Sequence, residues 1–283
     1  MNSQTIGYKA KAFEAWNLAF FFLIAFGLPL LAFGPFIFGI LRWPARVGAG
    51  LAIIFTVARF SPLIAAFVVT AITEGKASAR ALWRRFWNLN LRIKWLLVAV
   101  LLNPALRLVA SLVDRTLVGQ AYPFFDTNFL TMVMTGLIIG MQEEFGWRGY
   151  VLPRFQAKWN ALTSSIILGV IWAPYHLGNW FLPPGQGRQD SFWEFALWII
   201  LLSILYTWIF NNTNGSILAA ILFHGMVTNG LIQCCGVSWA MELLIGVTLL
   251  AVILIVIIFG GRSLVRGRPD QISRLQEVRV AGT

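Results

Sequence analysis

The sequence predicts an all-α fold: a polytopic transmembrane helical bundle with about eight spans. Two observations on composition predict it, because 58% of the 283 residues are hydrophobic and only 12% are charged, whereas soluble domains carry about 25% charged residues. The third observation is the length of the apolar runs. A helix rises 1.5 Å per residue and therefore needs about 20 apolar residues to cross the hydrocarbon core of a membrane.

Eight apolar runs of this kind give the expected spans. The first contains Pro29 and Pro35, which predict a long, kinked or tilted helix. The runs cover residues 15–41, 48–72, 94–113, 127–142, 162–182, 193–210, 215–235 and 240–260. The predicted organisation has three parts, which are N-terminal transmembrane helices with a basic cytoplasmic loop (1–126), core helices (127–260) and a basic cytoplasmic tail (261–283).

The basic residues gather on one side of the predicted spans. The chain has 22 Lys and Arg against 11 Asp and Glu, and most of the cations lie in the N-terminal segment, in the loop 76–94 and in the tail after residue 261. This positive-inside pattern predicts that both termini are cytoplasmic, in the plasma (inner) membrane if the source is bacterial. The lipid bilayer is therefore the expected partner of this charge, and no nucleic acid is expected.

Two adjacent carboxylates interrupt this apolar chain in the stretch "GMQEEFGWRGYVLPRF", residues 140–155. Glu143 and Glu144 are expected at the end of the fourth span, near the cytoplasmic face, with a site that opens to that side. A carboxylate at hydrocarbon depth costs several kcal/mol unless it is paired or hydrated, so by default it marks a functional site. Glu144 and Arg148 lie four residues apart on one helix face and can form an ion pair. Glu143 is then left without a predicted partner.

Both histidines of the chain, His176 and His224, fall inside predicted spans. A single buried histidine is more often structural than catalytic, but two of them beside a spare carboxylate are hard to explain by packing alone. An ion-coupled transporter would also place such groups at membrane depth. A transporter would normally show two related halves, however, and here the polar groups are confined to one half.

Three blocks resemble the motifs of the CPBP family of intramembrane proteases, which includes the CAAX prenyl endoproteases and the bacteriocin-processing and immunity-associated (Abi-type) proteins. "EEFGWR" resembles the motif E-E-x-x-x-R, "WAPYH" is similar to F-x-x-x-H with Trp172 in place of Phe, and "NGSILAAILFHGMVTN" resembles the segment that holds H-x-x-x-N. The resemblance covers roughly residues 127–235 and implies that 127–260 is a protease core.

The resemblance implies an intramembrane endopeptidase that hydrolyses a peptide bond of a membrane-associated protein or peptide, prenylated if the chain follows the CAAX branch. Glu143 would activate a water molecule that His176 also holds, and His224, with Thr228 or Asn229, would stabilise the oxyanion. Glu144 and Arg148 would support the end of the fourth helix.

The third motif departs from the family pattern. Thr228 stands where the family has Asn, and Asn229 follows it. Four residues return a helix to nearly the same face, so Thr228 is expected to face the site beside His224. A non-catalytic binding or immunity protein of the same family is therefore an alternative. No cofactor is favoured, although zinc bound by Glu143, His176 and His224 stays open as an alternative.

Overall fold

A computed structural model describes residues 3–44, 47–87, 91–118, 129–183, 187–228 and 240–265, and within these ranges the chain forms helices and connections without a strand. The elements in chain order are α1 (Ser3–Ile37), α2 (Ala49–Arg59), α3 (Ser61–Thr73), α4 (Lys76–Arg84), α5 (Ile93–Val118), α6 (Phe129–Glu144), η1 (Phe145–Val151), α7 (Leu152–Gln156), α8 (Ala161–Tyr175), η2 (Leu177–Trp180), α9 (Phe192–Asn212), α10 (Ile217–Thr228) and α11 (Ala240–Phe259). The predicted all-α polytopic fold is confirmed.

The spans differ in detail from the eight predicted ones. In the described part of the chain, five helices are long and apolar enough to cross a membrane, and a sixth span results if α2 and α3 count as one. These two helices meet at Phe60 with a bend of 61°, and Pro62 stands in the first turn of α3, where the missing N–H is tolerated. The helix α10 has only 12 residues, and Cys234 and Cys235, which end its predicted span, lie outside the described residues.

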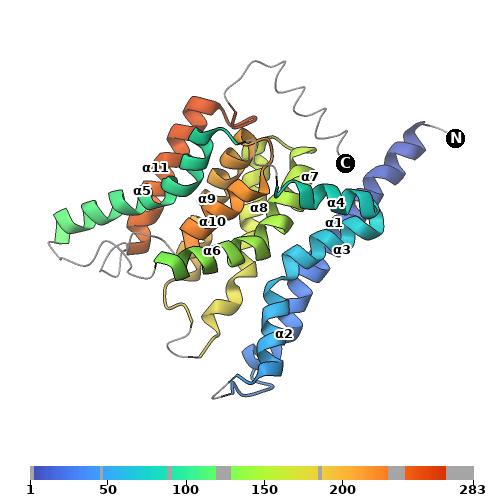
Figure 1. The fold of residues 1–283 in the computed structure, drawn as a ribbon, viewed down its shortest axis with the longest axis horizontal. Coiled ribbons are helices and arrows are strands. Elements are labelled where there is room, and N and C mark those ends of the chain that lie inside the picture. The colour runs from blue at the N-terminus through green and yellow to red at the C-terminus, as the bar shows by residue number, and fades with distance from the viewer. Residues whose placement is uncertain are drawn as a thin grey trace.

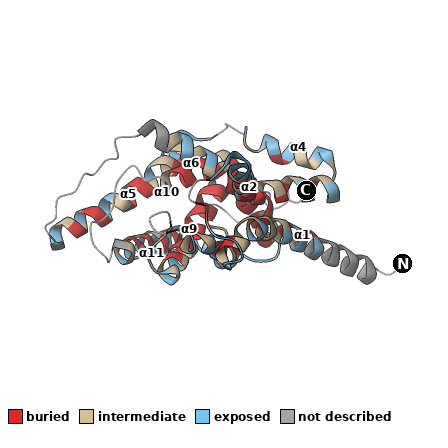
Figure 2. Ribbon diagram, turned by 90° about the horizontal axis from the view of Figure 1, so that it is seen from below, coloured by how far each residue is buried: buried red, intermediate tan, exposed pale blue. Residues whose placement is uncertain are grey.

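The helix α9 forms the centre of the bundle, and most of it from Phe195 to Asn211 is buried (Figures 1 and 2). The outer helices α1 and α11 turn large apolar side chains outward, with Leu31 exposed by 76% and Ile257 by 73%. Such a surface suits lipid rather than water. In Figure 1, the first turns of α1 and the last turn of α11 point to one end of the bundle, and the α1–α2 and α8–α9 connections lie at the other.

The backbones of α6 and α10 touch at two glycines. A Cβ atom built on Gly136 would lie 2.7 Å from the Cα of Gly225, a distance at which no side chain fits. Small residues allow membrane helices to approach in this way. The contact brings α6, which ends at Glu144, against the helix that carries His224.

We expect Gly136→Ala to reduce the stability of the protein by about 1–3 kcal/mol, because the added methyl group forces the two backbones apart. Thermal unfolding in detergent measures the effect. Gly27→Ala is the matched control, since a Cβ atom at that position would meet nothing within 4 Å. Equal unfolding temperatures of the two variants would show that α6 and α10 can separate without cost.

The helix that begins as α6 continues through a π-helical segment, η1, into α7, which ends at Gln156. All seven residues of η1 are buried, and a Cβ atom on Gly146 would lie 2.6 Å from the Cβ of Pro62. Segments of π-helix are rare and are frequent at functional sites. The helical backbone thus continues beyond residue 142, where the fourth span was predicted to end, and Glu143 and Glu144 lie inside a longer helical stretch.

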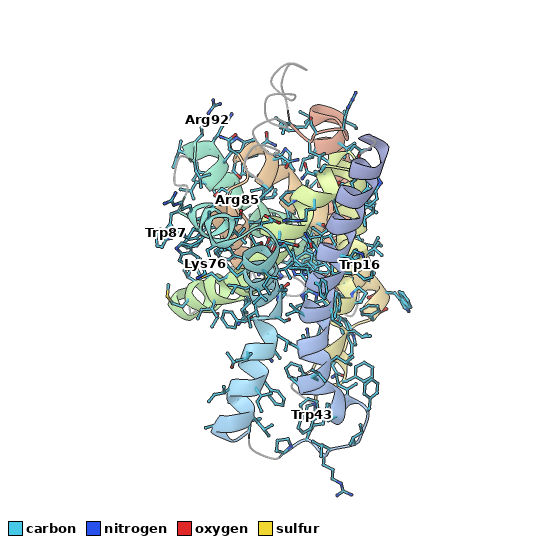
Figure 3. All side chains as sticks on the ribbon, turned by 90° about the vertical axis from the view of Figure 1, so that its right-hand side faces the viewer. Trp16, Trp43, Lys76, Arg85, Trp87 and Arg92 are labelled. Carbon is cyan, nitrogen blue, oxygen red and sulfur yellow. The ribbon has the colours of Figure 1, made fainter. Side chains whose placement is uncertain are left out.

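The basic segment after α3 is partly tied to this π-helix. Arg85 donates hydrogen bonds to the carbonyl oxygens of Gly149 at 2.9 Å and Gly215 at 3.4 Å. Lys76, Trp87 and Arg92 lie on the same side of the molecule as Arg85 (Figure 3). The segment thus combines an anchor on the core with cationic and aromatic side chains at its surface, an arrangement typical of a membrane interface.

Candidate active site

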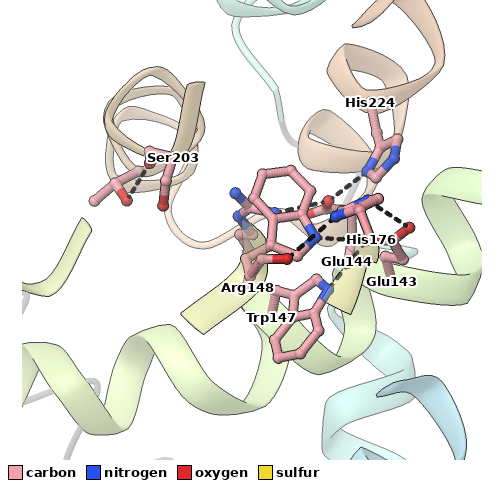
Figure 4. Close-up of polar contacts among 9 residues, drawn as sticks. Glu143, Glu144, Trp147, Arg148, His176, Ser203 and His224 are labelled. Atoms are coloured by element: carbon pink, nitrogen blue, oxygen red, sulfur yellow. Dashed lines mark hydrogen bonds and ion pairs between the residues drawn. The ribbon is translucent and has the colours of Figure 1, made fainter. Parts of the chain in front are cut away.

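Four elements bring the predicted site residues together (Figure 4). Glu143 and Glu144 end α6, Arg148 lies in η1, His176 follows α8 and His224 lies in α10. These residues come from positions up to about 80 apart in the chain, and the close packing of α6 on α10 and of α8 on α9 unites them. The cluster lies inside the bundle, where charges act on one another more strongly than in water.

Glu144 is the centre of a buried ion cluster. Its Oε1 accepts a hydrogen bond from Nη1 of Arg148 at 2.9 Å, so the pair predicted from their spacing forms. The same oxygen lies 2.6 Å from Nδ1 of His224, a contact that the sequence did not predict. The guanidinium carbon of Arg148 stacks between two rings, 4.1 Å from the centroid of Trp172 and 3.8 Å from that of Tyr206. The side chains of Glu144 and Arg148 are fully buried.

Glu143 has different partners on its two oxygens. Its Oε2 accepts hydrogen bonds from the indole N–H of Trp172 at 2.6 Å and from that of Trp147 at 3.1 Å. Its Oε1 lies 3.7 Å from Nε2 of His176, which is too far for a direct hydrogen bond. The two indole groups therefore fix the orientation of the carboxylate and leave one oxygen towards the histidine.

Sequence reasoning missed Trp147 and Trp172 as partners of the carboxylate. Two signals were available. Trp147 follows Glu143 by four residues, and Trp172 replaces the phenylalanine of the family motif. The structure supplies a physical reason for the second departure, since Phe has no donor with which to bind Oε2 of Glu143.

We expect Trp172→Phe to lower kcat for peptide hydrolysis about 10-fold, because one hydrogen bond to an ionised group is lost while Trp147 keeps the other. Steady-state kinetics on a cleaved peptide measures this. Trp208→Phe is the control, because its buried indole N–H has no hydrogen-bond partner among the described residues. Equal kcat values for the Trp172→Phe variant and the wild type would show that Trp147 alone holds the carboxylate.

A cavity of about 720 Å³ adjoins the end of α6, the helix that carries the two carboxylates. Glu143, His176 and His224 line it, and Thr228 lies on its wall one turn beyond His224, as predicted from their spacing. Asn229 lies outside the described residues. The rest of the wall is largely apolar and includes Phe26, Leu30, Phe33 and Phe38 of the α1 region together with Leu177 and Leu182 after α8.

The cavity extends away from the end of the bundle where α11 ends. The backbone N–H groups of Ala161 and Leu162 donate to the carbonyls of Arg262 and Gly261, so α8 starts beside the end of α11. His176 follows the other end of α8, about 22 Å away at 1.5 Å per residue. The expectation that the site opens on the same side as the termini is therefore wrong.

The cytoplasmic position of the termini remains a prediction from the charge pattern. On that orientation, the cavity would face the outer side of the membrane, because its wall includes the α8–α9 connection. The same connection carries Arg188, which lies apart from the three basic stretches that the charge pattern places in the cytoplasm.

A zinc ion bound by Glu143, His176 and His224 is the alternative that the sequence leaves open. Throughout the described ranges, no group of three or more His, Cys, Asp or Glu side chains is placed to hold a metal ion. His224 directs Nδ1 to Glu144, which is itself paired with Arg148. These contacts engage Nδ1 of His224 with a carboxylate.

Residues 125–229 match the sequence profile of a family described as Type II CAAX prenyl endopeptidase Rce1-like. CAAX prenyl protease 2 of Methanococcus maripaludis is 28% identical over 183 residues, which cover 58% of this chain and 68% of that protein. Lysostaphin resistance protein A of Staphylococcus aureus strain Newman is 23% identical over 185 residues, which cover 63% of this chain and 42% of the relative. The chain thus spans less than half the length of the lysostaphin resistance proteins.

Proposed function

This chain belongs to the CPBP family of membrane proteases, and on that premise we propose that it is a glutamate-dependent endopeptidase that cleaves a membrane-associated protein or peptide. The observation that carries the proposal is the pair of facing atoms, Oε1 of Glu143 and Nε2 of His176, on the wall of the cavity. They are 3.7 Å apart, a separation at which a bridging water molecule is the natural partner of both.

The hydrogen bonds of His176 support this role for the pair. Its Nδ1 lies 3.1 Å from the backbone carbonyl oxygen of Trp172. A carbonyl only accepts, so Nδ1 carries the proton of the neutral ring and Nε2 is an acceptor. An ionised Glu143 and this nitrogen are then two acceptors that face each other. A water molecule can donate one hydrogen to each, which directs its oxygen lone pairs towards the cavity.

The proposed reaction is hydrolysis by this water. Its oxygen attacks the carbonyl carbon of the peptide while Glu143 accepts its proton. The tetrahedral intermediate collapses when the C–N bond breaks, and Glu143 returns the proton to the leaving amine. The second proton of the water passes from the new carboxylic acid to the amine, so the products are a carboxylate and an ammonium group, and the enzyme ends in its starting protonation state.

In the proposed reaction, His224 and Thr228 stabilise the oxyanion of the intermediate. A ring that donates to Glu144 through Nδ1 and to the oxyanion through Nε2 carries both protons, and Oε1 of Glu144 at 2.6 Å is then its counterion. Thr228 can add one hydroxyl donor from the next turn of α10. Preorganised donors of this kind contribute most in a site shielded from water.

The substrate class follows from the shape and chemistry of the cavity. Its wall on α1 is apolar and lies beside the reactive groups, so a lipid chain attached to the substrate could occupy that side while the peptide reaches Glu143. A prenylated peptide, as in the name of the Methanococcus relative, is the first substrate to test.

The experiment that tests the function compares the N-terminal and C-terminal peptide ends in membranes that contain the wild type or Glu143→Gln. Ends that form only with the wild type establish proteolysis and identify the substrate together. Identical sets of ends from folded proteins in their natural membrane would instead support the non-catalytic binding role, to which the Thr228 replacement also points.

A further inference from the structure

The short helix α4 presents a basic face to its surroundings, formed by Lys76, Arg80 and Arg84. These residues recur at every fourth position, so they lie along one side of the helix, and all three are exposed. None of the ion pairs formed among the described residues includes any of them. Residues 75–94 contain six Lys and Arg and no Asp or Glu. The basic face therefore has no anionic partner within its own segment.

The helix α4 lies between two candidate membrane spans, since it follows the bent span that ends with α3 and precedes the span formed by α5. Arg85, directly after α4, donates to the carbonyl oxygen of Gly215 beyond the end of α9. At that same end of α9, Asn212 donates to the carbonyl oxygen of Leu264, which follows α11. The helix α4 is therefore at the end of the bundle away from which the cavity extends. The charge pattern predicts this end to be cytoplasmic, and the cytoplasmic leaflet carries a negative surface potential.

The other face of α4 packs on the π-helix η1. Leu82 is buried, and its Cδ1 would lie 3.0 Å from a Cβ atom built on Gly149. The ring of Trp83 stacks on that of Phe145, with 5.6 Å between the centroids and an angle of 11° between the planes. Arg85 donates to the carbonyl oxygen of Gly149 at 2.9 Å. The segment of α4 thus contacts both the first residue of η1 and a residue in its second half.

These contacts relate the basic face to the candidate site, because η1 carries two of the groups that hold the carboxylates. Trp147 donates to Glu143, and Arg148 pairs with Glu144. A helix of nine residues has little stability of its own, and like charges four residues apart repel one another. An anionic ligand on the basic face offsets this repulsion and stabilises the folded helix by mass action. The folded helix in turn supports η1 through its buried face.

We propose that the basic face of α4 binds the headgroups of anionic phospholipids, and that this binding stabilises η1 and raises the rate of hydrolysis at Glu143. The position of α4 between two spans favours lipid phosphates over soluble anions, because the headgroups lie at that level. Trp83 and Trp87, exposed by 40% and 58%, supply rings of the kind that gather at a membrane interface, and Trp87 lies on the same side of the molecule as Lys76 (Figure 3). This inference rests on the proposed peptidase function and adds its regulation, in which the lipid composition of one leaflet controls a cavity that extends towards the other.

Vesicles of two compositions test the inference. The full chain is placed in phosphatidylcholine vesicles with or without phosphatidylglycerol, and kcat is measured on a saturating prenylated peptide without net charge, so that attraction of the peptide to the vesicle does not decide the rate. We expect phosphatidylglycerol to raise kcat about 5- to 10-fold, a coupling of ordinary size between two sites. Hydrogen exchange of the η1 amides should slow by a similar factor. Salt at about 1 M, where the Debye length is about 3 Å, should abolish both effects.

The triple variant Lys76→Gln/Arg80→Gln/Arg84→Gln should lose both responses to phosphatidylglycerol. Lys76→Arg/Arg80→Lys/Arg84→Lys is the matched control, because it changes the same three side chains and keeps their charges, so it should retain both responses. Arg42→Gln removes an exposed cation from the α1–α2 connection at the other end of the bundle and should respond as the wild type does. A charge-conserving variant that fails to respond would overturn the inference, since the side chains would then act through their shape and not through their charge.

The remaining outcomes separate this inference from the proposed function. If the peptide is cleaved equally in both vesicles and η1 exchanges equally, the inference is wrong and the peptidase function stands. Inorganic phosphate added to phosphatidylcholine vesicles should have no effect; activation equal to that by phosphatidylglycerol would also overturn the inference, because the basic face would then bind a soluble anion. If no vesicle gives cleavage above the level of Glu143→Gln, the peptidase proposal fails, and the regulation of hydrolysis fails with it.

Discussion

Glu143→Gln is expected to lower kcat by about 10²- to 10⁴-fold, the contribution typical of a general base. Glutamine keeps the size of the side chain, and its oxygen can still accept from Trp147 and Trp172, which both donate to Oε2 in the wild type. It cannot take a proton from the water between Glu143 and His176. The variant should therefore fold and bind substrate but turn it over very slowly.

Kinetics on a cleaved peptide and thermal unfolding in detergent together measure this result. Glu242→Gln makes the same chemical change at an exposed position of α11 outside the cavity, so it should keep the wild-type kcat. Activity retained by Glu143→Gln would move the role of base to another residue, with Glu144 as the first to test. A fall in unfolding temperature equal to the fall caused by Gly136→Ala would show that the substitution disturbs the fold.

Arg148→Met should have the largest effect on stability. Arg148 and Glu144 are fully buried, and removal of the guanidinium group leaves the carboxylate with His224 as its remaining partner, at a cost of up to about 3–5 kcal/mol. The variant also loses the guanidinium group that stacks between Trp172 and Tyr206. Lysine should not restore it, because an ammonium group cannot stack between two rings as a plane does. Chemical and thermal unfolding in detergent measure the loss.

Arg154→Met is the matched control, since Arg154 also pairs with a glutamate and lies over an aromatic ring, at 3.6 Å from the Tyr150 centroid. Its ion pair with Glu74 is partly exposed, with 18% and 21% of the side chains accessible, so its loss should cost about 0–1 kcal/mol. The double variant Glu144→Gln/Arg148→Met should be more stable than Arg148→Met alone, because the buried side chain that lost its guanidinium partner is then neutral. A double variant no more stable than the single one would show that stacking, and not charge, holds Arg148.

The fold class was predictable from composition and apolar runs, because a membrane requires long apolar helices. The break at Phe60 was not, although Pro62 follows it at once. A proline is tolerated in the first turn of a helix and also within transmembrane helices, so the residue alone does not reveal where a helix ends. The extent of α6 was missed for a related reason: hydropathy falls at Glu143, but the backbone continues helically to Gln156.

For the candidate site, the motifs identified the residues, and local spacing predicted the contact between Glu144 and Arg148. The contact between Glu144 and His224 could not be derived in this way, because it joins residues 80 positions apart and depends on the close approach of Gly136 to Gly225. An indole donor is equally invisible in sequence. Tryptophan is common in membrane proteins because it packs well and lies at the membrane interface. Its role as a hydrogen-bond donor to a carboxylate therefore becomes visible only in the structure.

The π-helix places a limit on protein engineering. A π turn holds more residues than an α turn, so the seven residues of η1 set the rotation of everything that follows them. A designer who copied the two glutamates and the arginine onto a regular α-helix would preserve their spacing in sequence. The direction of each later side chain would still change, by up to about 100° for each residue of difference. A transplant of this site therefore has to carry the whole stretch from Glu143 to Val151. It also has to keep Gly146, because the absence of a side chain there lets Pro62 of α3 pack against the π-helix.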